Sequence, residues 1–335
     1  MTWGARLRRG TSALLGVLLA ASGCADEQGG SGSTPTTSVE PPVDAGGGGT
    51  RPEASTTTDA GVDASDGGAG WPEGFVPTPQ NVPSGQLCNI PDDYVANGGD
   101  PVNPPCELES DRFSDRDRFD VPNALRWATW NVEWGRNADL VLDLLATDPG
   151  LGDIDILMLQ EVPRHDQEGT VPGINLTREI AQQQQLDYVF AVEWDRRENA
   201  DEGGEHGLAI LSKYPIGNAS LIRHTPCYDH YSEKGHYGGR ATLAVDLAIG
   251  DRRVRVYDAH YATRDVDGTC RAMQGDEVLA DAHLPTQPVV QLLGGDFNTV
   301  ICTPLLHLCN DPSYAEAVVR ALQLDSWTDL LPTFT

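Results

Sequence analysis

The chain has 335 residues and a formal net charge of -27 at pH 7. This length allows one large domain, or two small ones with extensions. The acidic balance excludes a chain-wide basic surface that would hold nucleic acid by charge alone, although metal ions can supply positive charge locally.

The N-terminus has the pattern of a bacterial lipoprotein signal peptide over residues 1–24. Three arginines within the first ten residues precede an apolar run, residues 13–21, which is too short to span a bilayer. The run leads into Ala21-Ser22-Gly23-Cys24, which resembles a lipobox, although leucine is commoner at the first position. We expect export, with a lipidated Cys24 anchoring the protein to the outer membrane or cell surface. An ordinary signal peptide with a leftover cysteine is the alternative.

The cysteine count agrees with export. Seven cysteines minus Cys24 leave six, and an even number in an exported chain predicts disulfides. Sequence proximity favours the pairs Cys88–Cys106, Cys227–Cys270 and Cys302–Cys309. The sequence has no C-x-x-C pair, so a zinc ribbon is not expected.

Composition divides the remainder of the chain into three parts. Residues 25–80 are mostly Gly, Ser, Thr, Pro, Asp and Ala. Such a segment buries too little surface to offset the entropy of ordering, so we expect a disordered tether. Residues 81–124 form a Pro-rich lead-in that Cys88 and Cys106 would staple. The folded domain is expected over residues 125–335.

Strands and helices are predicted to alternate through this domain. The expected strands cover residues 126–132, 154–159, 188–193, 207–212, 216–223, 240–249, 252–260 and 289–293. The expected helices cover residues 137–145, 177–186, 272–283 and 314–322. Gly250-Asp251 is typical of a hairpin turn. Strands interleaved with helices and hairpins indicate a mixed α/β sandwich.

The stretch Gly294-Gly295-Asp296-Phe297-Asn298 carries the strongest local signal. Two glycines break the apolar strand at 289–293, and a carboxylate and an amide follow at once. A carboxylate at the end of a buried strand is costly without a partner. A hard cation with a phosphate oxygen would suit these side chains. Taken alone, the stretch is equally compatible with an Asx turn after a strand.

Polar side chains also end three other predicted strands: Asn131, Gln160-Glu161 and His260. Loops at one end of a sheet converge, so we expect these residues to line one pocket with Asp296. Glu161 can hold a hard divalent cation. Asn131 can orient phosphate oxygens or the metal's shell, as can Asn298. Asp296 can position or deprotonate water, and His260 can donate a hydrogen bond or proton to a phosphate oxygen.

Five segments carry a resemblance to a known family: Trp130-Asn131, Leu159 to Val162, His206 to Ile216, Asp258 to Tyr261, and Gly294 to Thr299. Together they resemble the endonuclease/exonuclease/phosphatase superfamily, which includes deoxyribonuclease-like nucleases, abasic-site endonucleases, bacterial sphingomyelinases and inositol polyphosphate phosphatases. The resemblance implies an α/β (α+β) fold, a four-layer α/β/β/α sandwich of two mixed β-sheets. It also implies phosphoester cleavage by an activated water with Mg²⁺, or with Mn²⁺ or Ca²⁺.

The resemblance further implies individual roles. Glu161 would be the metal ligand, and Asn131 would help to hold metal or phosphate. His260 would contact the scissile phosphate, while Asp296 and Asn298 would orient the nucleophile and the transition state.

Arg240 stands where relatives often carry a basic, substrate-binding residue; an exposed arginine at a strand start is the alternative. The family's C-terminal Ser-Asp-His motif is missing up to Thr335. We expect a chain truncated before its C-terminal strands. A catalytically impaired surface binding module is the second hypothesis, because losing a general base costs orders of magnitude in rate.

The substrate class stays open at this level. A nuclease would need basic residues around its groove, and the arginines between 252 and 255 are the main cluster. A sphingomyelinase would need an exposed aromatic hairpin that enters the membrane. The tyrosines between residues 228 and 237 are the candidates, but the sequence around them shows no clear apolar hairpin. We expect a monomer whose partners are a phosphoester (nucleic acid, phospholipid head group or small phosphodiester) and, through its lipid, the bacterial membrane.

Overall fold

The structure is a computed structural model. It describes residues 15–17, 70–81, 86–88, 90–91, 93–135, 138–164, 175–196, 204–227, 236–263, 265, 268–299 and 328–329. The predictions for Cys24, for the Cys302–Cys309 pair, for most of the tether and for the helix at 314–322 lie outside the described residues.

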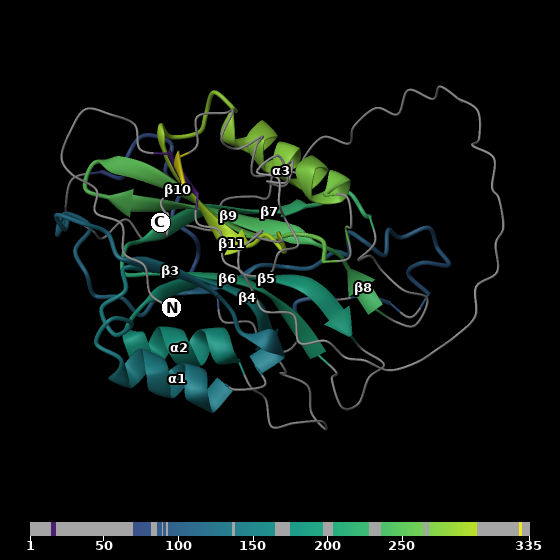
Figure 1. Cartoon of the computed structure of the whole chain (residues 1–335), viewed down its shortest axis with the longest axis horizontal. Coiled ribbons are helices and arrows are strands. Elements are labelled where there is room, and N and C mark those ends of the chain that lie inside the picture. The colour runs from purple at the N-terminus through teal and green to yellow at the C-terminus, as the bar shows by residue number, and fades with distance from the viewer. Residues whose placement is uncertain are drawn as a thin grey trace, which may run out of the picture. The chain divides into compact units, whose positions relative to one another are not determined.

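Two mixed β-sheets lie face to face (Figure 1). The first sheet has the strand order β12-β1-β11-β10-β9-β7, in which β9 is antiparallel to both neighbours and the strands from β10 to β12 run parallel. Its strands are β1 (Leu15–Val17, within the predicted signal peptide), β7 (Ile216–Arg223), β9 (Ala241–Ile249), β10 (Arg252–His260), β11 (Val290–Asp296) and β12 (Thr328–Asp329).

The second sheet has the order β2-β5-β6-β4-β3, and β8 pairs with β5 beside this path. Only the β3–β4 pair among its described strands is parallel. Its strands are β2 (Glu109–Asp111), β3 (Trp127–Asn131), β4 (Ile156–Arg164), β5 (Asp187–Arg196), β6 (Gly204–Ser212) and β8 (His236–Gly238).

Helices cover the outer face of each sheet (Figure 1). α3 (Thr269–Ala282) packs on the first sheet, whereas α1 (Ala138–Thr147) and α2 (Leu176–Gln184) pack on the second. A short 3-10 helix, η1 (Glu133–Gly135), follows β3. The predicted four-layer α/β/β/α sandwich is confirmed. No helix among the described residues is long and apolar enough to cross a membrane.

Side-chain alternation along the strands separates three hydrophobic cores. In β4, Leu157 and Leu159 face α1 and α2, while Ile156 and Met158 face the other sheet. Successive side chains of a strand point to opposite faces, so an apolar run such as this one can serve two cores. The third core joins α3 to the first sheet through Tyr257, Leu293 and Val278 among others.

Two predicted strand ends are wrong, and both lie near the polar motifs. β4 does not end at Gln160-Glu161 but continues to Arg164 through a bulge between Leu159 and Val162. The two glycines do not break β11, which runs on to Asp296. A Cβ at Gly294 would lie 2.5 Å from Met158 Cε, and a Cβ at Gly295 would lie 2.0 Å from the Ala259 carbonyl oxygen. Glycine is therefore required for β11 to pair here.

The lead-in contributes to the packed unit. β2 pairs with β5, and Leu87 and Ile90 are buried in the core under α1 and α2. The compact unit reaches back to Trp71 and buries Phe75, so the predicted end of the disordered tether at residue 80 is wrong. No strand was predicted within the Pro-rich lead-in, so β2 is an addition to the predicted fold. The structure forms the Cys88–Cys106 and Cys227–Cys270 disulfides that sequence proximity predicted.

Candidate active site

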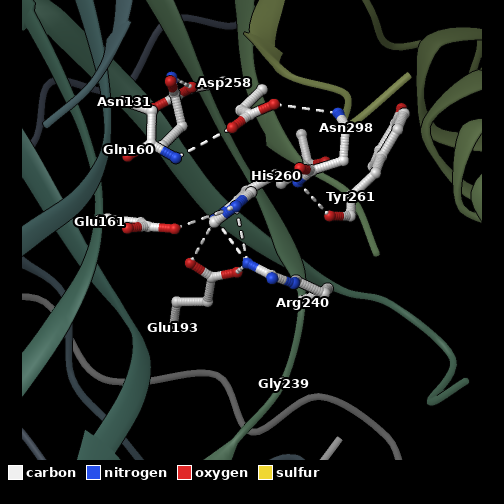
Figure 2. Close-up of polar contacts among 12 residues, drawn as sticks. Asn131, Gln160, Glu161, Glu193, Gly239, Arg240, Asp258, His260, Tyr261 and Asn298 are labelled. Carbon is white, nitrogen blue, oxygen red and sulfur yellow. Dashed lines mark hydrogen bonds and ion pairs between the residues drawn. The ribbon is translucent and has the colours of Figure 1, made fainter. Parts of the chain in front are cut away.

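Strand ends from both sheets converge at one end of the sandwich, as the sequence predicted. β10 and β11 run parallel with His260 opposite Asp296, and β3 and β4 run parallel with Asn131 opposite Gln160. The two sheets are joined where Asn131 Nδ2 donates a 2.9 Å hydrogen bond to Asp296 Oδ2. Figure 2 shows Asn131 and Gln160 near His260.

Asp296 is held in one orientation by two donors. Its Oδ1 accepts the backbone N–H of Asn298 at 2.9 Å, and its Oδ2 accepts from Asn131. Asn298 has a positive φ of 49° and donates from Nδ2 to the Tyr261 carbonyl at 2.9 Å. The Asx turn and the inter-sheet contact therefore coexist, because one carboxylate oxygen serves each.

Glu161 reaches the site because the bulge in β4 turns its backbone. Its φ is 56°, an uncommon value for a residue other than glycine, and such values cluster at functional sites. Glu161 Oε1 lies 3.8 Å from His260 Nε2, and the Glu161 side chain remains partly exposed. The bulge thus aims a carboxylate at the imidazole (Figure 2).

Glu193, near the end of β5, is the central residue that sequence analysis missed. It is fully buried, and its Oε2 lies 2.8 Å from His260 Nδ1. Burial by itself would raise the pKa of Glu193, but its interactions with His260 and with the Arg240 guanidinium outweigh burial and lower that pKa to about 2. An ionised carboxylate can only accept, so His260 Nδ1 carries a hydrogen and donates it to Glu193.

Arg240, which precedes β9, contacts both His260 and Glu193. Its Nη1 is 2.7 Å from His260 Nε2, 2.9 Å from His260 Nδ1 and 3.3 Å from Glu193 Oε1. The guanidinium can only donate, so Nε2 is the ring nitrogen with a lone pair to offer. The side chain of Arg240 is mostly buried. The alternative of an exposed arginine at a strand start is therefore wrong.

A second buried acid, Asp258, lies beneath this group. Gln160 Nε2 donates to Asp258 Oδ1 at 2.5 Å and to Thr129 Oγ1 at 2.9 Å, which links β4, β10 and β3. Burial raises the pKa of Asp258 well above its ordinary value, and the charges of Glu193 and Asp296 act in the same direction. Glu193 and Asp258 are both acidic residues within a mostly apolar strand, at positions whose side chains are buried. That pattern is the sequence signal that could have identified them.

The donor set fits a magnesium ion with few protein ligands. Among the described residues there is no group of three or more His, Cys, Asp or Glu side chains that could hold a metal ion. Magnesium commonly uses one or two carboxylates and completes its shell with waters and substrate phosphate oxygens. The partly exposed carboxylate of Glu161 meets that requirement.

The Cys227–Cys270 disulfide is one of several ties between α3 and the segments around it. It joins the segment after β7 to the first turn of α3, and Glu277 of α3 contacts His224 Nδ1 at 2.7 Å. From the same helix, Gln274 Oε1 accepts the N–H of Ala262, two residues after His260. The backbone that follows His260 is therefore tied to α3.

Residues 128–331 match the sequence profile described as the Endonuclease/Exonuclease/phosphatase family. No curated protein sequence matches the chain.

Similar solved structures include the human nocturnin catalytic domain with bound sulfate, at 18% identity and a TM-score of 0.44, covering 66% of this chain and 73% of that one. Sphingomyelinase C from Streptomyces griseocarneus is 16% identical with a TM-score of 0.38, covering 58% and 68%. TDP2 from Caenorhabditis elegans is 20% identical with a TM-score of 0.34, covering 54% and 50%.

Proposed function

The chain belongs to the endonuclease/exonuclease/phosphatase family, and on that premise we propose that it is an exported, lipid-anchored, magnesium-dependent phosphoesterase. The proposed reaction is hydrolysis of a phosphodiester or phosphomonoester by a metal-assisted water. The observation that carries the proposal is the Asn131–Asp296 hydrogen bond between the sheets, with His260 and Glu161 beside it.

Each residue has a task that follows from its contacts. Asp296 is fixed by Asn131 and by the Asn298 backbone, so its carboxylate can accept a hydrogen bond from the attacking water in one defined direction. His260 is oriented by Glu193, which leaves Nε2 on the side of Glu161 and Arg240. Arg240 carries the positive charge that a phosphate oxygen requires.

Glu161 would hold the divalent ion, with Asn131 close to its shell. When bound, Mg²⁺ supplies polarisation of a phosphoryl oxygen and neutralises developing negative charge. Mn²⁺ and Ca²⁺ share the preference for carboxylate oxygen and are the alternatives to test.

The central experiment measures hydrolysis of bis(4-nitrophenyl) phosphate, DNA and sphingomyelin by the full-length protein, with Mg²⁺ and with EDTA. Asp296→Ala should lower turnover by roughly 10²- to 10³-fold, in the range expected for a group that handles protons in the reaction. Asp251→Ala, in the exposed turn between β9 and β10, is the matched control and should leave turnover unchanged. Activity that survives in the Asp296 variant would show that the site lies elsewhere.

An inactive wild-type protein on all three substrates would instead support the alternative of a surface binding module. The anchor is tested separately. Wild-type protein should be found in the membrane fraction of expressing bacteria, and Cys24→Ser should release it into the soluble fraction. Wild-type protein that is already soluble would contradict lipidation.

A further inference from the structure

Exposed apolar side chains of the described residues gather at the end of the sandwich opposite the site. Among all the described residues, eight large hydrophobic side chains are exposed. Two of them, Val95 and Leu140, lie away from this end of the sandwich. The other six surround the turn between β9 and β10, and we call them the hairpin-end patch: Trp71, Val76, Phe119, Val121, Leu284 and Val289.

Contacts to the β9–β10 turn hold the first part of the patch together. The Arg118 carbonyl accepts the N–H of Gly250 at 2.7 Å, and the Arg118 guanidinium lies over the rings of both Trp71 and Phe119, at 4.9 Å and 4.5 Å. A Cβ built on Gly250 would lie 3.3 Å from Val121 Cγ2. Three of the six side chains therefore adjoin one turn.

The remaining members are joined through Arg253, near the start of β10. Its Nη1 donates to the Gly74 carbonyl at 3.3 Å, two residues before Val76. Its Nη2 donates to the Thr286 carbonyl at 2.7 Å, in the loop that carries Leu284 and Val289. One arginine thus brings the segment at 74–76 and the segment at 284–289 to the same end of the first sheet.

The residue types match a lipid interface better than a dry protein core. A contiguous exposed apolar patch marks an interaction site. Tryptophan is enriched where a protein meets the head-group region, and arginine can lay its stem on apolar surface while its charge stays in water. Trp71 and Phe119 supply the aromatic side chains and the exposed Arg252 supplies the charge, whereas the Arg118 side chain that contacts both rings is itself buried.

The position of Trp71 in the sequence indicates what contacts the patch. Trp71 follows the segment that begins at Cys24, 47 positions earlier (71 − 24). The composition of this segment predicts a tether, and a Gly-rich tether of that length would have a root-mean-square end-to-end distance of about 40 Å. We propose that the hairpin-end patch lies on the bilayer to which Cys24 is attached. This proposal rests on the lipid anchor of the proposed function.

This orientation turns the candidate site away from the lipid. β10 is nine residues long, and it starts with Arg252 beside the patch and ends with His260 in the site. At about 3.3 Å per residue the two ends are roughly 25 to 30 Å apart. The proposal therefore favours phosphoesters dissolved in water, such as nucleic acid or a small phosphodiester, over the head groups of the same bilayer.

The experiment uses the full chain with Cys24→Ser, so that no lipid contributes to binding. The protein is sedimented with vesicles of phosphatidylethanolamine and phosphatidylglycerol. We expect binding that falls at least about fivefold in the Trp71→Ser/Phe119→Ser variant. The Val95→Ser/Leu140→Ser variant removes two apolar side chains outside the patch and should bind as the parent does.

Hydrolysis of bis(4-nitrophenyl) phosphate is measured on the same samples. Both double variants should retain the turnover of the parent, which also shows that they are folded. Absence of vesicle binding by the Cys24→Ser parent overturns the proposal, as does equal binding by the patch variant. A dimer that the patch variant dissociates in sedimentation velocity would assign the patch to a second copy and also overturn it. Vesicle binding without turnover would contradict the proposed function and leave the membrane contact standing.

Discussion

Glu193 Oε2 lies 2.8 Å from His260 Nδ1, although the two residues are 67 positions apart in the sequence. Glu193 comes from the second sheet and His260 from the first, so this contact and the Asn131–Asp296 bond join the sheets at one end. Both Glu193 and His260 are buried. The pair therefore sets which nitrogen of the imidazole is presented to a substrate.

Glu193→Gln should lower kcat by roughly 10- to 100-fold, because an amide holds the Nδ1 hydrogen less strongly and replaces a charged partner of Arg240 by a neutral one. The Michaelis constant for a small phosphodiester should change much less. Steady-state kinetics across pH would check this, with Glu179→Gln on the exposed side of α2 as control. A wild-type pH profile in the Glu193 variant would limit Glu193 to a structural role.

The lowered pKa of Glu193 also predicts that the stability of the fold depends on pH. The pKa of Glu193 is lowered from 4.5 to about 2 in the folded protein, so the unfolded chain binds its proton first. Its contribution to the free energy of unfolding is present above pH 4.5 and is lost as the pH falls from 4.5 towards 2. Urea unfolding at pH 6 and pH 3 should show a larger loss for wild type than for Glu193→Gln. Equal losses would contradict the lowered pKa.

Glu161→Gln should raise the Mg²⁺ concentration for half-maximal activity by at least about tenfold, because the amide has no charge to offer the ion. Added Mg²⁺ should restore part of the rate. Titration of activity against Mg²⁺ measures the effect, and Glu107→Gln, on an exposed side chain, is the control. An unchanged Mg²⁺ requirement would remove Glu161 from the metal site.

Gly295→Ala should lower the free energy of unfolding by about 3 kcal/mol or more, since the backbone has a φ of 136° and the new Cβ would lie 2.0 Å from the Ala259 carbonyl oxygen. Thermal and urea unfolding provide the measurement. Gly70→Ala is the control, because nothing lies within 4 Å of a Cβ at that position. A cost below about 1 kcal/mol would show that β11 and β10 can separate locally.

Much of the fold was predictable because burial leaves a local pattern. The bounds of β7 and β10 agree with the prediction to the residue, and the apolar run of β4 indicated a strand buried on both faces. The three-residue strands β2 and β8 were not predicted, because a pattern of period two has too few repeats to be seen over so short a length.

Local sequence features predicted the alternation of apolar side chains and the polar residues at the strand ends, and they favoured the two disulfide pairs seen here. These are properties of neighbouring residues, of chain spacing and of side-chain chemistry. Three features required the folded arrangement: Glu193 orients His260, a bulge aims Glu161 at the site, and Gly295 continues a strand. Each of these depends on which backbone lies opposite, and local propensity does not encode the partner of a strand.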